Sequence, residues 1–572
     1  MTQGLKDQVL EPDTKSGAES HLRDRIARHP VVAGLTSGLV LWSAFPPVEW
    51  SWLAWVALVP LFWLVIQPRP RLRLYLGAWI GGLTFWGLSV QWVRLSDPSA
   101  WVAWLALALI FSLWWPGFLF LARLAVFRLE IPLMMAAPIL WVGMEYIRAH
   151  ILTGFPWYYL GHSQYRFLML IQIADTTSAL GISFLIAVVN AWIVDLLALP
   201  LLRRSARGTR LTARQTVRLW VVGLMIAGTL AYGSYRLSTA QFRNGPRLAL
   251  LQTNFPQRYK MGGDPLQLLQ RIEHLVTRAI DRQPRPDLVV WPETAYPYGY
   301  IATEVGLPPE ELARQMQAIG GHPTTSDWTD RKGKIAQYLH GMTNVAGVPM
   351  LVGSLFYDHR KDGFSKYNSA ILFEPAVQAI RAYHKLHLVP FGEFIPFLET
   401  LPWLTVFTPY GNGSVPTLNF GHDPLLLSLG QYRMAIAICF EDTVPHVIRR
   451  FFRETPDGRQ PDLLVNLSND GWFHGSAELD MHLAVSVFRT IEHRVPLTRA
   501  VNTGISALID GNGEIRDTLP RDTEAVLSVS VPLDDRTSNY TVLGDWVGMS
   551  CLAVTIGLVP MWLLRSRMRR PA

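Results

Sequence analysis

Three polar residues follow β-rich apolar runs, where a sheet can bring distant parts of a chain together. Glu293 follows LVVWP, Lys385 follows AIRAYH, and Cys439 follows MAIAI. Side chains at strand ends emerge beside the loops that form a cleft, and the strands hold them rigidly. A cysteine attacks as its thiolate, so it needs a base and a cation nearby, which Glu293 and Lys385 would supply. Together the three residues would allow covalent catalysis by the Cys439 thiol.

Each of these residues also has an ordinary structural explanation. A lone cysteine at the end of an apolar strand most often packs as a small hydrophobic residue, while a lone lysine or glutamate most often faces solvent or caps a helix. Their spacing in the sequence does not decide between the two readings, because the fold must bring the residues together. Cys551 lies in an apolar run and is expected to pack, and two cysteines give no disulfide framework.

No metal or cofactor site is predicted. The histidines are scattered, with no tight set of thiolates or carboxylates at ligand spacing, and no glycine-rich phosphate loop precedes a helix. They include His384, His387, His474, His482 and His493. His387 is expected to be structural although it lies close to Lys385.

The segment that contains the three residues has the pattern of an α/β domain. Short β-rich runs alternate with amphipathic stretches. The predicted strands are residues 248–253, 287–291, 350–356, 369–373, 434–439, 463–467 and 507–510. Two sets of apolar residues repeat at helical spacing and are expected to face a core: Leu268, Ile272, Leu275, Val276 and Ala279, and Ala484, Val487, Phe488 and Ile491. Residues 303–335 lack strand periodicity and are interpreted as a surface insertion.

Composition places the remainder of the chain in a membrane. Half of the 572 residues are hydrophobic, only 17% are charged, and 22 are tryptophan, which collects where hydrocarbon meets lipid headgroups. Eight nearly uncharged stretches are long enough to cross a bilayer as helices. They are residues 31–48, 51–67, 74–93, 101–122, 131–151, 181–202, 219–234 and 546–564. The first 30 residues lack the features of a removable signal peptide, so the first helix is expected to stay attached.

The arginines predict how these helices cross, because short basic loops remain cytoplasmic. Basic runs precede the first helix, follow the second and fourth, fill the sixth loop and end the chain. They are Arg23, Arg25 and Arg28; Arg69, Arg71 and Arg73; Arg123 and Arg128; Arg203, Arg204, Arg207, Arg210, Arg214 and Arg218; and Arg565, Arg567, Arg569 and Arg570. Both termini are therefore predicted to be cytoplasmic and residues 236–543 to lie outside. The net charge of +8 is explained by orientation, and no nucleic-acid partner is predicted.

Two predicted membrane helices contain acidic residues. Glu145 has Arg148 three residues further on, which favours a structural ion pair near the outer end of the helix. Asp195 is expected to support packing against a neighbouring helix, and it is assigned no chemistry.

Three local strings resemble signatures of the nitrilase superfamily: VVWPETA, YHKLHLVPFGEFIP and AIAICFEDTVP. Members of that superfamily carry a Glu, Lys and Cys triad in an αββα sandwich. The helices narrow the match, because a nitrilase-like domain between seven upstream helices and one downstream helix resembles the apolipoprotein N-acyltransferases of the bacterial envelope. The strings SAFPPVEWSWLAWVALVPL, TGFPWYYLGHSQ and NLSNDGWF are similar to that family too. The resemblance covers nearly the whole chain.

The expected fold class is α/β, with an eight-helix transmembrane bundle plus an αββα nitrilase-like sandwich. The expected parts are a cytoplasmic tail at residues 1–30, a seven-helix membrane domain at 31–235, an extracytoplasmic catalytic domain at 236–543, a C-terminal transmembrane helix at 546–564 and a basic cytoplasmic tail at 565–572.

The resemblance implies an acyl transfer in two half-reactions. In the family, the triad cysteine takes an acyl chain from a phospholipid, and the α-amine of an N-terminal S-diacylglyceryl-cysteine on an apolipoprotein attacks the thioester. On this sequence Cys439 would be the nucleophile, Glu293 the base and Lys385 the stabiliser of the oxyanion. The implied partners are a phospholipid donor, an apolipoprotein acceptor and the bilayer of the bacterial inner membrane, with the catalytic domain in the periplasm. No cofactor is expected.

Three neighbouring residues are expected to support the triad. The backbone N–H of Phe440 is a candidate donor to the oxyanion. Glu393 matches a second acidic position of the family and would orient Lys385 or the thiol, or else hold backbone N–H groups of its loop. Glu441 is expected mainly to support the turn at the strand end.

Aromatic residues cluster around the motifs. Core packing is the default for any one of them, but as a group on loops they would admit acyl chains from the bilayer. The candidate lipid-binding residues are Trp403, Phe407, Tyr410, Trp472 and Phe473, and Tyr296, Tyr298 and Tyr300 are expected on loops as well.

Two rival functions fit parts of the pattern. A membrane-tethered amidase of the nitrilase type would use the same three residues with water in place of the amine, although eight helices exceed what a tether needs. A transporter with an outer binding domain is disfavoured, because the helices show no broken pairs in repeated halves and few charges. Release of ammonia or free fatty acid would indicate the amidase, and full cellular activity of Cys439→Ala would favour the transporter.

Overall fold

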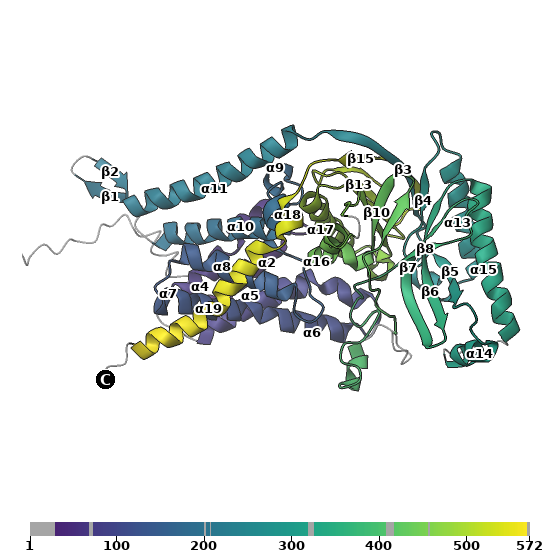
Figure 1. Cartoon of the computed structure of the whole chain (residues 1–572). Helices are drawn as coiled ribbons and strands as arrows, with labels where there is room; N and C mark the ends of the chain where they lie inside the picture. The colour runs from purple at the N-terminus through teal and green to yellow at the C-terminus, as the bar shows by residue number, and fades with distance from the viewer. Residues whose placement is uncertain are drawn as a thin grey trace, which may run out of the picture.

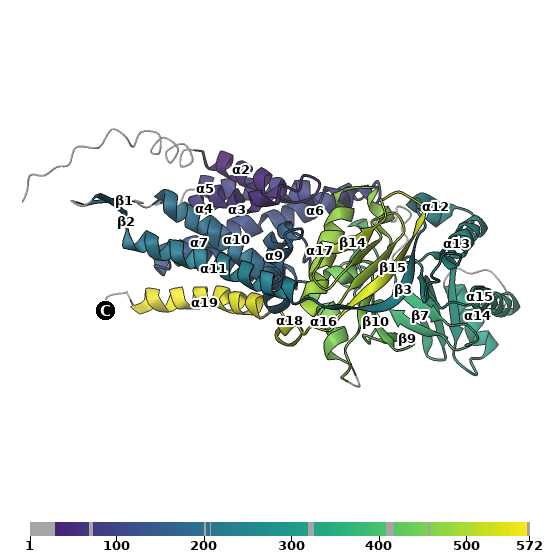
Figure 2. The ribbon, with the colours of Figure 1, turned by 90° about the horizontal axis from the view of Figure 1, so that it is seen from above.

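The computed structural model describes residues 29–67, 72–198, 202–205, 208–318, 325–407, 417–455 and 458–568. Apolar helices form one end of the molecule, and two stacked β-sheets with flanking helices form the other (Figure 1). A view turned by 90° shows the two parts lying end to end (Figure 2).

The helical end contains elements from both ends of the described chain. They are α2 (Pro30–Trp42), η2 (Ser51–Leu53), α3 (Ala54–Ala57), α4 (Val59–Val65), α5 (Leu72–Ser89), η3 (Gln91–Leu95), α6 (Trp101–Ser112), α7 (Trp114–Arg128), α8 (Leu133–Arg148), η4 (Leu160–Gln164), α9 (Leu168–Ile171), α10 (Ala174–Ala198), α11 (Ala213–Ser238) and α19 (Trp546–Met568). A short hairpin of β1 (Leu202–Ser205) and β2 (Gly208–Leu211) joins α10 to α11.

The prediction of eight membrane spans is confirmed only in part. Within the described ranges, four helices are long and apolar enough to cross a bilayer: Trp101–Arg128, Ala174–Ala198, Ala213–Ser238 and Trp546–Ser566. The other four predicted spans contain shorter or less apolar helices. Proline explains two of them, because Pro46 and Pro47 follow the end of α2, and Pro60 begins a new helix inside the second predicted span.

Helices α2 and α5 meet backbone to backbone. A Cβ on Gly34 would lie 1.8 Å from the carbonyl oxygen of Gly77, and one on Gly81 would lie 2.6 Å from the carbonyl oxygen of Gly34. Small residues allow helices to approach this closely and to gain dispersion contact where lipid removes the hydrophobic drive for association. The glycines in the two apolar runs therefore specify this helix pair.

The other end of the molecule is a two-sheet sandwich. Within the described residues, the first sheet has the order β15-β3-β4-β6-β7-β8, with β5 paired to β6, and the second has the order β14-β13-β12-β11-β10-β9. The first sheet contains β3 (Phe242–Gln252), β4 (Leu288–Val290), β5 (Tyr296–Thr303), β6 (Met350–Arg360), β7 (Gly363–Phe373), β8 (Arg381–His384) and β15 (Ala525–Asp534). The second contains β9 (Leu426–Leu429), β10 (Tyr432–Ile438), β11 (Leu463–Ser468), β12 (Leu497–Val501), β13 (Ala507–Ile509) and β14 (Ile515–Thr518).

Helices and 3-10 turns connect the strands and cover the sheets. They are α12 (Gln257–Gly262), α13 (Pro265–Ile280), α14 (Pro309–Ala318), α15 (Thr325–Ala346), η5 (Pro402–Phe407), η6 (Cys439–Thr443), α16 (Pro445–Arg453), η7 (Asp470–Phe473), α17 (Ala477–His493) and α18 (Asn539–Leu543).

Alternation along β3 explains why the predicted strands are continuous apolar runs. Leu248 and Leu250 belong to the core between the two sheets, while Ala249 and Leu251 belong to the core shared with α13 and α15. Both faces of the first sheet are therefore buried, as in parallel sheets covered by helices. Helices α16 and α17 cover the second sheet, which gives the αββα layers.

Each of the seven predicted strands overlaps a strand of the structure, namely β3, β4, β6, β7, β10, β11 and β13, although four predictions extend one residue past the observed ends. Both apolar helical sets are buried, on α13 and α17. Residues 303–335 are more regular than expected, because they contain α14 and the start of α15. The expectation that Tyr296, Tyr298 and Tyr300 lie on loops is wrong. They lie on β5, and the Tyr296 ring stacks at 6.2 Å on Tyr338 of α15.

A buried ion cluster joins the sandwich to the apolar helices. Asp175 of α10 accepts hydrogen bonds from Arg494 at 2.6 and 3.1 Å and from Tyr232 at 2.7 Å. Its carboxylate also lies 2.8 Å from Nε of Arg236, at the end of α11. Because Arg494 follows α17 directly, the covering helix of the second sheet is held against the membrane end.

Replacing Asp175 by Asn should weaken this junction, because it leaves two guanidinium groups with no counter-charge. Breaking one partner of a buried ion pair costs about 3–5 kcal/mol, so the thermal-unfolding midpoint of the detergent-solubilised protein should fall clearly. Asp535→Asn, which breaks the exposed pair with Arg243, is the matched control and should change little. Equal midpoints for the two variants would contradict a structural role for Asp175.

Candidate active site

Glu293 is held just beyond the end of β4. The pairing of this strand with β6 is extended by a hydrogen bond from Trp291 N–H to Leu351 O at 2.9 Å, and Glu293 lies two residues further along the chain. Only 7% of Glu293 is exposed. Its Oε1 accepts a hydrogen bond from Asn368 Nδ2 at 2.7 Å and lies 3.5 Å from Nζ of Lys385.

Lys385 follows β8 and is almost completely buried, with 1% exposed. Its Nζ lies 2.9 Å from both carboxylate oxygens of Glu393. Burial alone would lower the pKa of Lys385, but the carboxylates of Glu393 and Glu293 raise it above its ordinary value. Lys385 is therefore a fixed positive charge inside the site.

Cys439 begins η6, immediately after β10, and has a φ of +52°. This left-handed conformation is unfavourable for a side chain with a Cβ by about 1–2 kcal/mol. The turn is held by Asn466, whose Nδ2 donates to the carbonyl of Cys439 at 3.1 Å. Burial, together with the nearby Glu293 carboxylate, raises the pKa of the Cys439 thiol, which Lys385 lowers in part. The resting thiol is therefore neutral and needs a base in order to react.

Asn368 of β7 links two of the acids, and sequence reasoning missed it. Its Nδ2 donates to Glu293 Oε1 at 2.7 Å and to Glu393 Oε1 at 2.9 Å, while its carbonyl accepts from Lys385 N at 2.9 Å. The sequence shows Asn368 only as a polar residue next to the predicted strand SAILF. Many surface asparagines stand next to strands in the same way, so this position does not identify it as a site residue.

Glu393 and Glu441 lie on opposite sides of Lys385 in the hydrogen-bond network. Besides contacting Lys385, Glu393 accepts a hydrogen bond from the backbone N–H of Val389 at 2.8 Å, so its contacts fit both interpretations made from the sequence. Glu441 accepts from backbone N–H groups on both sides of the site and from Tyr383 Oη. These donors are Leu386 at 2.6 Å, His387 at 3.0 Å and Ile438 at 2.7 Å. Burial raises the pKa of Glu441 to about 7.

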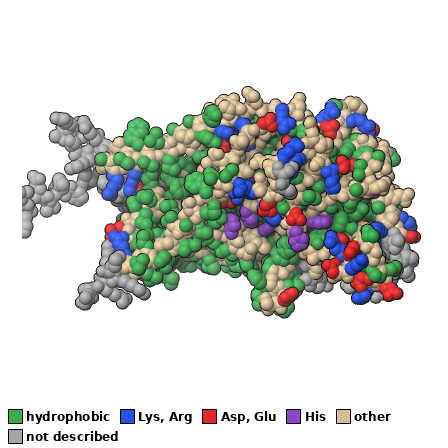
Figure 3. Space-filling model, viewed as in Figure 1, with side chains coloured by type: hydrophobic (Ala, Val, Ile, Leu, Met, Phe, Trp, Pro, Cys, Tyr) green, Lys and Arg blue, Asp and Glu red, His purple; other side chains and the backbone are tan. Residues whose placement is uncertain are grey.

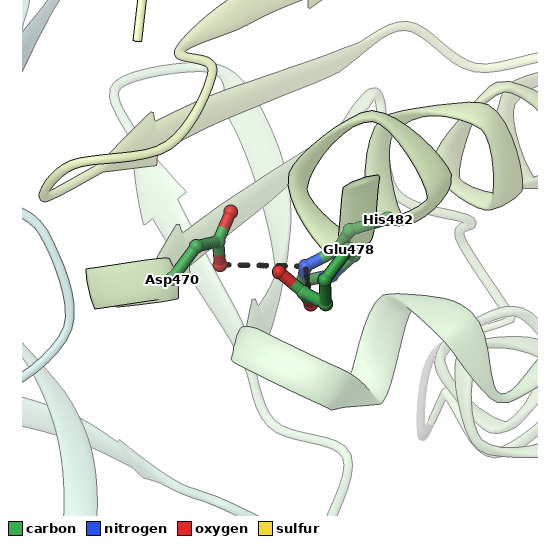
Figure 4. A group of neighbouring side chains, drawn as sticks. All are labelled: Asp470, Glu478 and His482. Carbon is green, nitrogen blue, oxygen red and sulfur yellow. Dashed lines mark ion pairs between the residues drawn. The ribbon is translucent and has the colours of Figure 1, made fainter. Parts of the chain in front are cut away.

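A second buried ion cluster supports η6 from behind. His482 Nε2 lies 2.8 Å from Asp442 Oδ1, and Arg499 Nη1 donates to Asp442 Oδ2 at 3.0 Å. Asp470, Glu478 and His482 point toward one another (Figure 4), and in the described part of the chain they form the one set of acidic and histidine side chains close enough to hold an ion. The expectation that the histidines are scattered is therefore wrong for His482, because α17 presents Glu478 and His482 on one face and η7 brings Asp470 to them.

The protein itself supplies the positive charge of this cluster. Arg499 Nη2 lies 3.7 Å from Asp470 Oδ2. Burial and Arg499 oppose a charge on His482, but Asp442 and Asp470 raise its pKa to about 10. The arrangement is that of an ion-pair network that fixes the turn after Cys439.

The loop between α8 and η4 forms a wall of the site. Arg148 donates to the carbonyls of Phe155 at 2.7 Å and Trp157 at 2.5 Å, and Glu145 accepts from Leu160 N–H at 2.9 Å. The two side chains form no direct ion pair with each other in the described structure, contrary to the prediction, and each holds this loop through its own hydrogen bonds. The Trp157 ring in turn stacks over Phe440 at 6.4 Å. Away from the site, Asp195 pairs with Arg218 of α11 at 3.0 Å, which agrees with a role in helix packing.

The aromatic candidates lie at different depths. Phe440 also stacks on His387 at 5.8 Å. Phe473 packs edge to face against Trp92 of the helical end at 4.8 Å, and Trp472 is half-buried beside it in η7. Trp403 of η5 is 62% exposed, Phe407 ends the same 3-10 helix, and Tyr410 lies outside the described residues.

Comparison with known proteins agrees with both halves of this architecture. Residues 247–539 match the carbon-nitrogen hydrolase family, and residues 37–192 match the apolipoprotein N-acyltransferase N-terminal domain. The structure of Nit3 from Saccharomyces cerevisiae, a member of branch 10 of the nitrilase superfamily, aligns with a TM-score of 0.34 at 18% identity, covering 51% of this chain and 93% of that one. The sandwich and its strand-end site thus define a nitrilase-like α/β domain.

Two curated relatives resemble the chain over nearly its full length. An apolipoprotein N-acyltransferase of Geobacter metallireducens is 32% identical over 541 residues, which cover 93% of this chain and 94% of that protein. One from Rhodopirellula baltica is 29% identical over 572 residues, covering 93% and 97%. The chain belongs to the apolipoprotein N-acyltransferase family.

Replacing Glu441 by Ala should destabilise the sandwich, because four buried donors lose their acceptor. Each unsatisfied buried donor costs about 1–3 kcal/mol, so the thermal-unfolding midpoint should fall markedly. Glu441→Gln retains an acceptor oxygen and should fall much less. Similar midpoints for the Ala variant and the unmodified protein would rule out this supporting role.

Proposed function

We propose that this protein is a phospholipid-dependent N-acyltransferase that completes the maturation of bacterial lipoproteins. The observation that carries the proposal is the convergence of Glu293, Lys385 and Cys439 at the strand ends of a nitrilase-like domain joined to apolar helices. The near full-length similarity to proteins named apolipoprotein N-acyltransferase supports the substrate class.

The first half-reaction forms a thioester. Glu293 takes the proton of the Cys439 thiol, and the thiolate attacks the ester carbonyl of a phospholipid. Lys385 and the backbone N–H of Phe440 stabilise the oxyanion that develops. The carbon–oxygen bond then breaks, and the lysophospholipid leaves with the proton that Glu293 returns to its oxygen.

The second half-reaction transfers the acyl chain to the lipoprotein. The neutral α-amine of the S-diacylglyceryl-cysteine attacks the thioester carbonyl, and Glu293 accepts a proton from the amine. The carbon–sulfur bond breaks, which forms the amide and releases the Cys439 thiolate, and the thiolate takes the proton from Glu293. Two substrates that use one cysteine in turn give ping-pong kinetics.

The surface of the helical end supports a position in the bilayer. Hydrophobic side chains cover the visible face of that end, while charged side chains gather over the sandwich (Figure 3). Large apolar residues are exposed on its helices, among them Leu105, Ile110, Trp220, Leu224 and Ile556. We propose eight spans, both termini in the cytoplasm, the parts bounded at residues 31–235, 236–543 and 546–564, and a periplasmic catalytic domain at the inner membrane.

The acyl-enzyme can be trapped with a phospholipid that carries a mass-labelled sn-1 acyl chain. Full-length enzyme in detergent, without acceptor, should acquire the label on the Cys439 peptide in a hydroxylamine-sensitive form. A diacylated lipopeptide with a free N-terminal amine should discharge the label, and the same peptide with a blocked amine should not. Mass spectrometry of the peptides measures each step.

Site variants test the assigned roles in the same experiment. Cys439→Ala should give no adduct, and Glu293→Gln should slow its formation by at least about 10²-fold, as for loss of a general base. Lys385→Met should slow it by about 10²–10³-fold. N-acyl product from Cys439→Ala would disprove the thioester route. Free fatty acid released equally fast with and without acceptor would instead indicate a hydrolase.

Replacing Trp403 and Phe407 by Ser tests whether η5 admits the lipid donor. A loop that settles into the bilayer interface through aromatic side chains should raise the apparent KM for phospholipid severalfold when they are lost, with kcat nearly unchanged. Val305→Ser, at another exposed apolar position, is the matched control. An unchanged KM in the double variant would contradict a role of η5 in admitting the lipid donor.

A further inference from the structure

A second lysine lies beside the proposed base. Lys260 of α12 donates from Nζ to the backbone carbonyl of Glu293 at 2.7 Å and to Thr294 Oγ1 at 2.8 Å. Lys260 is half-buried. None of the steps above uses Lys260.

The carbonyl that Lys260 holds lies at a strained point of the chain. Thr294, the next residue, has a φ of +45°, a conformation that disfavours side chains with a Cβ. On the other side, a Cβ on Gly353 of β6 would lie 2.0 Å from the carbonyl oxygen of Pro292. The backbone at Glu293 therefore packs closely against β6 and turns sharply, and the hydrogen bonds from Lys260 hold that turn.

The position of Lys260 is itself fixed from the second sheet. Asn502 Oδ1 accepts from Thr253 Oγ1 at 2.7 Å and from Phe255 N–H at 2.8 Å, on the segment that leads into α12. Asn469 Nδ2 donates to Gln257 Oε1 at 3.0 Å, at the first residue of α12. The asparagines that follow β11 and β12 thus set where Lys260 stands.

The charge of Lys260 gives it a second effect. It places a second ammonium, besides that of Lys385, close to Glu293 and Cys439. Burial lowers the pKa of Lys260 to about 8, an effect that Glu293 and Cys439 partly oppose, so its charge senses both reacting groups.

We propose that Lys260 is a positioning residue of the active centre: it anchors the backbone turn that aims Glu293, and its charge favours formation of the Cys439 thiolate. This inference rests on the proposed function, since it presumes that Glu293 deprotonates Cys439. The titratable groups that face Lys260 are Glu293 and Cys439.

Lys260→Met and Lys260→Arg test the proposal in the full-length enzyme. Alkylation of Cys439 by iodoacetamide, followed on its own peptide from pH 6 to 10, reports thiolate formation without lipid substrate. Loss of a nearby cation raises the thiol pKa, so the Met variant should shift the half-maximal pH upward, whereas Arg retains the charge and should hold it near that of the unmodified enzyme. In acyl transfer, the Met variant should lose at least about tenfold in kcat with KM within about twofold.

Lys361→Met, at the exposed turn between β6 and β7, is the matched control for removal of a lysine charge. An alkylation profile and a kcat for Lys260→Met equal to those of Lys361→Met would overturn the inference. A loss of kcat that Arg does not restore, with an unshifted alkylation profile, would also overturn it, because the residue would then be merely structural. If Glu293→Gln and Cys439→Ala retain acyl transfer, the proposed function fails, whatever Lys260 does.

Discussion

A charged group cannot be buried without compensation, and this constraint organises the active centre. Lys385 is 1% exposed, so its ammonium needs the carboxylates of Glu393 and Glu293 within ion-pair distance. Those carboxylates need donors of their own, and Asn368 supplies both from one amide nitrogen. The site is thus a set of mutual partners on β7 and on the segments that follow β4 and β8. Displacing one of them removes a partner from the others.

The same constraint extends outward from the nucleophile to the bilayer end. Asp442, three residues after Cys439, is balanced by His482 and Arg499. His482 lies on α17, and that helix is followed directly by Arg494, whose guanidinium pairs with Asp175 of α10. Buried ion pairs therefore link η6, which contains Cys439, to the apolar helix α10 by way of α17. The position of the thiol relative to the proposed membrane surface is fixed by ion pairs, which tolerate little displacement.

The sequence predicts the parts of this centre that obey a local rule. Glu293, Lys385 and Cys439 each follow a β-rich run, but the three motifs that resemble the nitrilase superfamily are what single them out, and each of the seven predicted strands overlaps a strand of the structure. Asn368, Lys260 and the His482 cluster could not be found, since their partners are distant in the chain and are brought near by sheet pairing. Within the described residues, four of the eight predicted spans lack a long apolar helix, and the reason is a different one. Composition measures apolar length, whereas a proline turn at residues 46–47 ends α2 at Trp42, before the apolar run is complete. The prediction that the tyrosines of β5 lie on loops is wrong because turn-forming residues surround them. Those residues obscure the strand alternation that packs Tyr296 into the core.

The neutral resting thiol of the proposed site agrees with acyl transfer. Burial and the nearby Glu293 carboxylate raise the pKa of Cys439, so in the proposed reaction the thiol depends on Glu293 to lose its proton. Exclusion of water from the proposed thioester would favour an amine acceptor over hydrolysis. The stacked rings of Trp157, Phe440 and His387 line the approach from the helical end. Because Trp157 belongs to the loop that Arg148 holds at the end of α8, the helical end supplies a ring that stacks directly on the residue after Cys439. The apolar helices would therefore shape the proposed site as well as anchor it.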